Sequence, residues 1–483
     1  MHFALISKVL GLLLVVFSFT MMPPVAVSYF YQDGSEGPFL ASFVISLLLG
    51  LVLWLPFFRH RAELQTRDGF LVVTLFWSVL GVIGGLPFLI SADTPVGFTD
   101  AVFESVSGLT TTGASVLSGL DTLPKSILYY RQQLQWFGGM GVIVLAVAIL
   151  PMLGIGGMQL YKAEIPGPMK DAKLTPRIAE TAKALWYLYL FITVACASAY
   201  WLAGMTLFDA ITHSFSTVAT GGFSTHDQSM AYWDNAAIDW ITTVFIIIGG
   251  TNFALHFAAI RGLSPLTFVR DPEFRFYIGM VFLYILLVTL GLLAFNVFQS
   301  ADETLRHAAF QVASFSTGTG YTSTNAAAWP GFVPFLLVFT SFLGASAGST
   351  GGGMKSVRGA LVFHHSIREL RRLIYPNGAF ALRFGRHTVN DRVLQAVWGF
   401  VGVYITIAVV FTLLFTVTGL DLTTAVSCVA ASLNNLGVGI GGVASGFADI
   451  SPTAKWMMTL LMLLGRLEIF TLLVLFTPLF WKQ

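Results

Sequence analysis

Charged residues and cysteines are both scarce in this chain. Of its 483 residues, 10% are Asp, Glu, Lys or Arg, and only two are cysteines, Cys196 and Cys428. Both cysteines lie in apolar stretches without the spacing of a metal site, so no disulfide framework or cysteine metal site is predicted. The net charge of +2 says little about soluble partners, and no nucleic-acid partner is expected.

Enzyme motifs are also lacking. The sequence contains no P-loop lysine motif, no dinucleotide-binding G-x-G-x-x-G after a strand and no H-E-x-x-H. The glycines at 351–353 resemble a phosphate loop only superficially, because they lie in an apolar segment. No nucleophile is paired with a base. We therefore expect that the chain is not an enzyme and that it binds no organic cofactor.

Apolar residues are abundant instead. They make up 55% of the chain, and the mean hydropathy of +0.77 is typical of a polytopic membrane protein. The first segment lacks a small-residue cleavage site and is longer than the apolar part of a signal peptide, so we expect it to be retained. Ten segments are long enough to cross a bilayer: 4–31, 38–58, 70–93, 126–154, 183–205, 237–261, 275–299, 331–365, 393–419 and 454–481.

The basic residues indicate how the segments are oriented. Of 26 lysines and arginines, 21 lie at the two termini or in the connections 59–69, 155–183, 261–275 and 354–392. By the positive-inside rule, both termini and these connections are cytoplasmic. The basic residues within 155–183 and 366–392 are compatible with anchoring beside anionic membrane lipid or with docking of an acidic cytosolic partner. The five exceptions are Lys125, Arg131, Arg306, Lys455 and Arg466.

One short pattern occurs four times, each time between two apolar segments. Every copy ends in a glycine, has an alanine twelve residues earlier, and has Ser, Ser, Ser or Ala six residues earlier. This spacing selects Gly437 over Gly439 in the fourth copy. Such stretches are too short to cross a bilayer, and irregular backbone at membrane depth must line a cavity or lie buried in protein. Four copies around one axis predict an ion pore with its filter glycines at Gly113, Gly222, Gly320 and Gly437.

The glycine motifs have the composition of an ion filter. Backbone carbonyl oxygens can replace the hydration shell of an ion where the chain is extended and side chains are out of the way. Glycine permits the positive φ that such turns require, and threonine adds hydroxyl groups. The predicted ion-binding residues are Thr111, Thr112, Gly113, Thr220, Gly221, Gly222, Gly318, Thr319, Gly320, Asn435, Leu436 and Gly437.

A short helix is expected before each filter, with the negative end of its dipole facing the cation. Asp100 and Asp209 lie thirteen residues before their glycines, where each is expected to cap its helix rather than to bind the ion. His307 and Thr424 take that position in the other copies, so the four copies do not form a charged ring. Gln132, Gln133 and Gln135 are expected to bond to the adjacent filter loop.

Two further features point to a gate below the filter. Four glycines within residues 348–353 cannot hold a stable helix, so this stretch is predicted to break the eighth segment as a flexible gate or a static kink. Arg466 is predicted to face the pore, with pairing to Glu468 as the alternative. The predicted gating residues are Gly348, Ser349, Thr350, Gly351, Gly352, Gly353 and Arg466.

These motifs resemble those of the bacterial Trk potassium-uptake subunits of TrkH type, within the Trk/Ktr/HKT superfamily. The resemblance rests on the glycine motifs and extends to residues 135–141 and 465–468. It implies an all-α polytopic membrane protein in which four channel-like helix–pore loop–helix repeats surround a pseudo-four-fold pore, preceded by a two-helix hairpin. The implied segments are 1–66 for the hairpin and 67–175, 176–266, 267–385 and 386–483 for the repeats.

The same resemblance implies K⁺ as the transported ion and the bacterial inner membrane as the location. It also implies a homodimer and a cytoplasmic nucleotide-binding ring of TrkA type that gates the pore. Because Gly113 is present where some Na⁺-favouring relatives have serine, K⁺ selectivity is expected. The alternatives are a secondary transporter with K⁺ coupled to H⁺ or Na⁺, for instance by symport, and the channel-like part of an ATP-driven pump.

Overall fold

The computed structural model describes residues 2–60, 65–144, 178–385 and 387–482. These residues are mostly helical, and the strands among them form one short hairpin of β1 (Arg383–Phe384) and β2 (His387–Thr388). The predicted connection 155–183 lies largely outside the described residues, as do Arg386 and the end of the fourth apolar segment.

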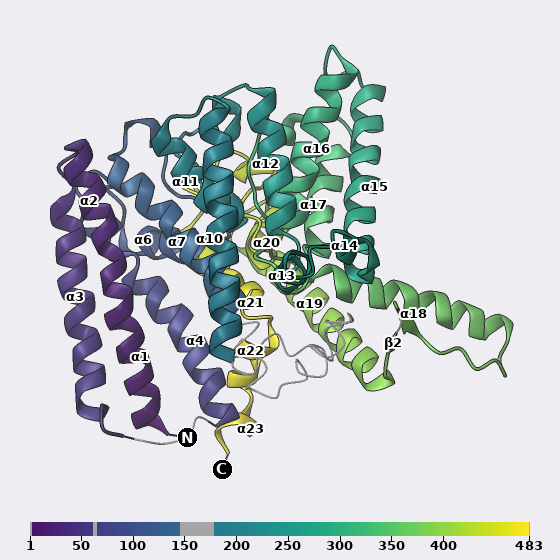
Figure 1. The fold of residues 1–483 in the computed structure, drawn as a ribbon, viewed down its shortest axis with the longest axis horizontal. Helices are drawn as coiled ribbons and strands as arrows, with labels where there is room; N and C mark the ends of the chain where they lie inside the picture. Colours follow the sequence, from purple (N-terminus) through teal and green to yellow (C-terminus); the bar gives the residue numbers. More distant parts are fainter. Residues whose placement is uncertain (1, 61–64, 145–177, 386, 483) are drawn as a thin grey trace.

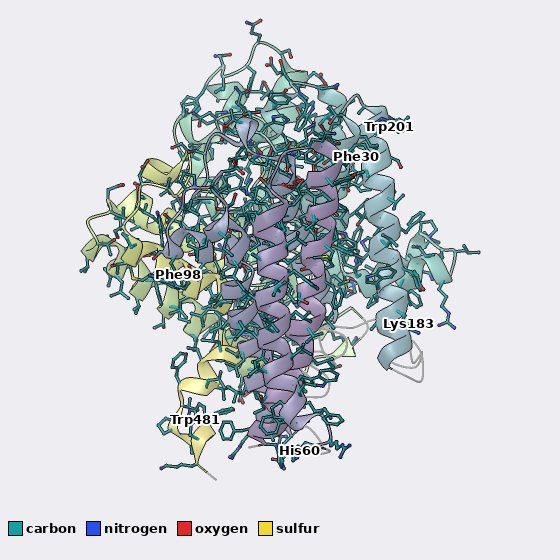
Figure 2. The ribbon with its side chains drawn as sticks, turned by 90° about the vertical axis from the view of Figure 1, so that its left-hand side faces the viewer. Phe30, His60, Phe98, Lys183, Trp201 and Trp481 are labelled. Carbon is teal, nitrogen blue, oxygen red and sulfur yellow. The ribbon has the colours of Figure 1, made fainter. Side chains whose placement is uncertain are left out.

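The N-terminal hairpin packs along one side of the molecule. It consists of α1 (Phe3–Ser18) with α2 (Met22–Tyr31) and the antiparallel α3 (Glu36–Trp54) (Figure 1). Gly11 and Gly50 allow the two helices to approach closely, since a methyl group on Gly11 would lie 2.7 Å from the Gly50 carbonyl oxygen. Figure 2 shows the hairpin running from the end near Phe30 to the end near His60.

Four helix–loop–helix units follow the hairpin. The first contains α4 (Thr66–Ile83), α5 (Leu86–Ile90), α6 (Phe98–Leu109) and α7 (Lys125–Val144), and the second α10 (Ile178–Leu202), α11 (Leu207–Val218), α12 (Ala236–Gly249), α13 (Phe253–Arg261) and α14 (Leu266–Arg270). The third contains α15 (Pro272–Ala294), α16 (Ala301–Thr317), α17 (Val333–Leu343) and α18 (Ser356–Ile374), and the fourth α19 (Asp391–Val417), α20 (Leu422–Leu433), α21 (Pro452–Arg466), α22 (Phe470–Leu473) and α23 (Pro478–Trp481).

In each unit, the helix before the glycine loop and the helix after it take part in one closed circuit of packed helices. Helix α6 packs against α7, α7 against α11, α11 against α12, and α12 against α16. Helix α16 then packs against α17, α17 against α20, α20 against α21, and α21 returns to α6. The predicted fold, four channel-like units around one axis after a hairpin, is therefore confirmed.

Three of the predicted membrane segments are not continuous helices. Among the described residues, six helices are long and apolar enough to cross a bilayer, or eight if two bent pairs each count as one span. The segments 237–261 and 454–481 were each predicted as one span, but α12 and α13 meet at 94° and α21 and α22 at 109°. The segment 331–365 divides into α17 and α18 around a loop at 344–355.

The bends have local causes. At the first, Asn252 accepts a hydrogen bond from the Ala254 amide and so starts the new helix α13. At the second, Glu468 and Ile469 have φ values of 55° and 48°, which an α-helix cannot accommodate.

The two ends of the described chain meet at the start of α4. His2 bonds to Asp68 through its amide at 3.0 Å and its ring at 2.9 Å, and Arg67 donates to the Lys482 carbonyl oxygen at 2.7 Å. Both ends of the described chain therefore lie on one side of the molecule. Helix α18 extends away from the bundle on that lower side (Figure 1).

Candidate ion pathway

The four short helices that lead into the glycine motifs are almost completely buried. Helices α6, α11, α16 and α20 contain the alanines of the repeated pattern, which are at most 1% exposed in every copy. Figure 2 places Phe98, the first residue of α6, between the two ends of the molecule rather than at either of them. These helices therefore enter the membrane part of the way, as the glycine pattern predicted.

The predicted caps of these helices need correction. Asp100 and Asp209 each occupy the third position of their helices, and the residue three positions earlier is the cap. In α11 the Thr206 hydroxyl oxygen accepts the Asp209 amide, and in α20 Asp421 plays the same part for Thr424. Asp100 instead forms an ion pair with Lys455 of α21, at 2.7 Å. The helices begin about one turn earlier than the aligned aspartates suggested.

Each short helix ends in the same pair of left-handed residues. The residue two before the filter glycine has a φ between 49° and 77°, and the glycine itself has a φ between 75° and 82°. Between them, one amide donates to the carbonyl oxygen six residues before the glycine, namely Ser107, Ser216, Ser314 or Ala431, at 2.8–2.9 Å. Gly437 rather than Gly439 has this geometry in the fourth copy.

The four filter glycines form a closed ring in which each one packs against a backbone carbonyl oxygen of the next repeat. A methyl group on Gly113 would lie 2.0 Å from the carbonyl oxygen of Gly221. The same construction brings Gly222 to 1.9 Å from the Thr319 oxygen, Gly320 to 2.0 Å from the Leu436 oxygen, and Gly437 to 2.0 Å from the Thr112 oxygen. Each glycine thus packs against the carbonyl before the next glycine, and the fourth repeat returns to the first. No side chain fits at any of these four positions.

Side-chain hydrogen bonds also stabilise the loops that form the ring. Gln135 donates to the Gly221 carbonyl oxygen at 2.7 Å and accepts the Phe223 amide at 3.1 Å, and Gln132 donates to the Phe223 oxygen at 3.2 Å. Asn435 donates to the Thr112 hydroxyl at 2.9 Å, which joins the fourth repeat to the first. The glutamines were expected to bond to the adjacent filter loop; two of them bond to the loop of the second repeat, whereas Gln133 bonds to Thr20.

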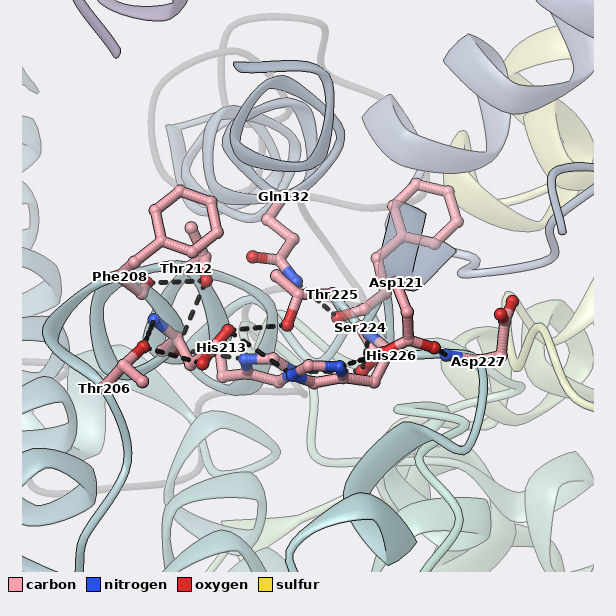
Figure 3. Close-up of polar contacts among 12 residues, drawn as sticks. Asp121, Gln132, Thr206, Phe208, Thr212, His213, Ser224, Thr225, His226 and Asp227 are labelled. Atoms are coloured by element: carbon pink, nitrogen blue, oxygen red, sulfur yellow. Dashed lines mark hydrogen bonds and ion pairs between the residues drawn. The ribbon is translucent and has the colours of Figure 1, made fainter. Parts of the chain in front are cut away.

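The outer ends of the first two loops meet at His226. Its ring contacts Asp121 of the first loop (Figure 3). The ring also lies 3.7 Å from a carboxylate oxygen of Asp209 and stacks on Tyr232. Burial acts to lower the pKa of His226, but the hydrogen bonds to Asp209 and Asp121 outweigh it and raise that pKa above its usual value. The two carboxylates therefore stabilise the charged form of this histidine, which links two repeats outside the membrane-spanning segments.

The glycine-rich loop at 344–355 lies directly below the ring. A methyl group on Gly352 would be 1.9 Å from the Asn434 carbonyl oxygen, and one on Gly351 would be 2.5 Å from the Thr317 oxygen. Both oxygens belong to the ends of short helices that lead into the filter. Within the predicted gating stretch 348–353, Thr350 donates to the carbonyl oxygens of Val218 and Gly249, each at 3.0 Å. The loop therefore contacts the backbone of the second, third and fourth repeats.

Arg466 connects this loop to the first repeat. Its guanidinium donates to the Thr350 carbonyl oxygen at 2.9 Å and to the Gly138 oxygen at 3.0 Å, and the residue is only 5% exposed. The alternative that Arg466 pairs with Glu468 is wrong, because Glu468 forms an ion pair with Arg358 at 2.7 Å. Arg466 and Glu468 both line a cavity of about 40 Å³ below the filter, together with Gly351–Gly353.

Several charged residues of this region were not assigned a role from the sequence. Glu273 accepts the Ala347 amide at 2.6 Å and the Ser356 hydroxyl at 3.0 Å, so it holds both ends of the loop. The Lys355 ammonium donates to the Gly351 carbonyl oxygen. Glu104 and Arg131 form a buried ion pair behind the first filter loop. For Arg131 and Lys355, the available signal was a cation inside an otherwise apolar segment.

The fold and the ring define a polytopic membrane protein with a channel-like pathway built from four repeats. Residues 36–482 match the sequence profile of the TrkH family, described as a cation transport protein. The chain belongs to this family. It is 55% identical to the Trk system potassium uptake protein TrkH of Vibrio parahaemolyticus and 52% identical to that of Escherichia coli, with 100% of each chain covered.

A solved relative has the same fold. The crystal structure of the potassium transporter TrkH from Vibrio parahaemolyticus superimposes with a TM-score of 0.93, at 53% sequence identity and with full coverage of both chains. The family identified from the glycine motifs is thereby confirmed.

Proposed function

We propose that this chain conducts K⁺ into the cell, across the bacterial inner membrane, through the ring of Gly113, Gly222, Gly320 and Gly437. The observation that carries the proposal is the closed ring itself, in which a backbone carbonyl oxygen from every repeat packs against the glycine of the repeat before it. Such oxygens substitute for the hydration shell of a cation. The names of the relatives, potassium uptake proteins, favour K⁺ as the ion.

A single pathway along the gradient is favoured over coupling to H⁺ or Na⁺. The four units of this fold are alike, whereas coupled transporters typically combine inverted halves with titratable groups at the membrane midplane. The side chains bonded around the ring include those of Thr112, Thr319, Asn435 and Gln135, none of which titrates in the physiological range.

The gate is assigned to residues 348–353 and Arg466. The loop lies against the ends of α16 and α20, so an ion that leaves the ring toward the cytoplasm meets it first. Opening would require the Arg466 bonds to Thr350 and Gly138 to break. A nucleotide-binding cytoplasmic ring of TrkA type, acting on a homodimer of this chain, would supply the energy for that step. The segments 1–66, 67–175, 176–266, 267–385 and 386–483 remain the proposed divisions of the chain.

The test is electrical recording from the purified protein in planar bilayers, with K⁺ on one side and Na⁺ on the other. A reversal potential set by the K⁺ gradient alone is expected. A potential that moves with a pH gradient or with Na⁺ would replace this proposal by coupled transport. Absence of current in the isolated chain, with current after addition of a nucleotide-binding partner, would support the gate.

A further inference from the structure

A buried ion pair lies behind the outer part of the first filter loop. The Arg131 Nε atom of α7 lies 2.8 Å from the Glu104 Oε1 atom of α6, and the two side chains are only 1% and 0% exposed. Two charges removed from water are costly unless their remaining hydrogen-bonding groups are also satisfied. The other partners of this pair therefore indicate what it holds in place.

Those partners are the chain segments that follow two filter glycines. Glu104 accepts the Val116 amide at 3.0 Å and the Ser115 hydroxyl at 3.1 Å. Arg131 donates to the same Ser115 hydroxyl at 2.9 Å and to the Ser224 carbonyl oxygen at 3.1 Å. Ser115 and Ser224 each stand two residues after a filter glycine. The pair thus connects the outer filter segment of the first repeat to that of the second.

The other repeats have weaker groups at the position of Glu104, nine residues before the filter glycine. In the second repeat the His213 ring bonds to the Ser224 hydroxyl at 3.1 Å (Figure 3), and in the third Gln311 donates to the Thr324 carbonyl oxygen at 3.2 Å. The fourth repeat has Cys428. Of these four positions, only the first contains a charge, so the outer end of the filter is supported asymmetrically.

We propose that Glu104 and Arg131 are positioning residues that set ion selectivity by fixing the separation of the first two outer filter segments. The proposal rests on the proposed function of the glycine ring. A guanidinium presents several donors in one rigid plane, so Arg131 can hold Glu104, Ser115 and Ser224 at once. Discrimination between cations depends on where the carbonyl oxygens lie, and a site loses precision when its supporting contacts loosen.

The test replaces Arg131 by lysine. Arg131→Lys keeps both charges of the pair, but one ammonium cannot reproduce the planar set of contacts. In proteoliposomes that contain either K⁺ or Na⁺ as the only permeant cation, the K⁺/Na⁺ flux ratio is expected to fall by about ten-fold. K⁺ is also expected to stabilise the variant against heat less, relative to Na⁺, than it stabilises the parent protein, since ion binding adds to stability.

Glu104→Asp provides a second variant if Arg131→Lys does not fold. It also keeps the charge, but the shorter side chain cannot reach both Arg131 and the Val116 amide. The matched control is Arg306→Lys, because Arg306 pairs with Asp239 at 3.6 Å in another pair of repeats and otherwise bonds to its neighbour His307 rather than to a filter segment of the described chain. The control is expected to retain the parent flux ratio.

Flux of both ions reduced in parallel, with an unchanged ratio, would show that the pair only supports the fold and would overturn the proposal. Gly113→Ser is measured in the same assay, so that failure of the positioning role can be distinguished from failure of the filter assignment. If Gly113→Ser lowers the ratio and neither Arg131→Lys nor Glu104→Asp does, the positioning role alone is wrong. If none of the three lowers it, the glycine ring is not the filter.

Discussion

The ring and the loop beneath it are both rich in glycine, but they are held in different ways. The ring is built four times, with the same φ values and the same backbone hydrogen bonds in every repeat. The loop at 344–355 belongs to the third repeat and depends on single side chains, with Glu273 at its ends, Arg466 on Thr350 and Lys355 on Gly351. We infer that the repeated backbone geometry suits a permanent function such as selectivity, and that a few individual bonds suit a part that must move.

The packing supports the same distinction. A filter glycine is confined by the carbonyl of the next repeat, which belongs to a segment anchored by its own helix. The loop also packs closely against the ends of α16 and α20, but Gly351–Gly353 and Arg466 line a cavity of about 40 Å³ beside it. We infer that this cavity gives the loop room to shift.

The largest effect on selectivity is expected when a side chain is introduced into the ring. Gly113→Ser and Gly222→Ser each place a Cβ atom about 2 Å from a carbonyl oxygen and at a φ of 82°, so the oxygen must move. The K⁺/Na⁺ flux ratio is expected to fall by more than about ten-fold. Gly399→Ser is the control, because nothing lies within 4 Å of a methyl group there. Parent-like ratios for both filter variants would refute the filter assignment.

The loop is expected to respond in the opposite manner, with changed flux and unchanged selectivity. Deletion of Gly351–Gly353 removes the contacts with the Thr317 and Asn434 carbonyl oxygens. Basal ⁸⁶Rb⁺ uptake into proteoliposomes without a cytosolic partner is expected to rise strongly, while the K⁺/Na⁺ ratio stays at the parent value. If uptake by the folded variant stays the same or falls, the loop is a static break in the helix.

Substitutions of Arg466 test the loop further, because they separate the effect of its positive charge from the effect of its hydrogen bonds. At an effective dielectric constant near 20, a positive charge about 8 Å from a K⁺ ion costs roughly 2 kcal/mol, on the order of thirty-fold in occupancy. Arg466→Ala is therefore expected to raise ⁸⁶Rb⁺ uptake several-fold without a change in selectivity.

Arg466→Lys distinguishes the two roles of this residue. Uptake close to that of the parent indicates repulsion by charge, and uptake close to that of the alanine variant indicates that the guanidinium holds the loop through Thr350 and Gly138. Parent-like uptake for both variants, at equal reconstitution, would remove Arg466 from the gate.

The smallest effect is expected at His226, outside both the ring and the loop. Because its pKa is raised above the ordinary 6.5, its charged form stabilises the fold fully below pH 6.5, and this contribution is lost as the pH rises through the raised pKa. His226→Gln is therefore expected to lower the Tm most in acid and least in alkaline buffer, with an unchanged flux ratio. A Tm difference that stays constant between about pH 5.5 and 9, a range that includes the usual histidine pKa, would contradict this expectation.

Much of the fold could be predicted because the repeats are local patterns. The spacing of alanine, serine and glycine identified Gly113, Gly222, Gly320 and Gly437, which all have a positive φ. The four glycines within 348–353 predicted a break in a helix, and the structure contains that break. The caps were misplaced because the aligned aspartates lie in the third helical position, where an acid also favours the helix dipole.

Pairing of charges could not be predicted in the same way. Arg466 and Glu468 are neighbours in sequence, but the positive φ of Glu468 turns its side chain toward Arg358, and Arg466 bonds to two backbone carbonyls instead. Glu104 and Arg131 are 27 residues apart and belong to separate helices, so no short spacing marks them as partners.

By itself, then, the sequence determined the helix break at 348–353, the glycines that adopt a left-handed conformation in the ring, and the existence of four equivalent units. These properties depend on apolar length, on glycine and on the periodic pattern, all of which act over a few residues. Only the tertiary structure decided which carbonyl faces each glycine and which groups hold the loop. Those contacts join residues as distant as Gly138 and Arg466, 328 positions apart, and they exist only after the fourth repeat has closed against the first.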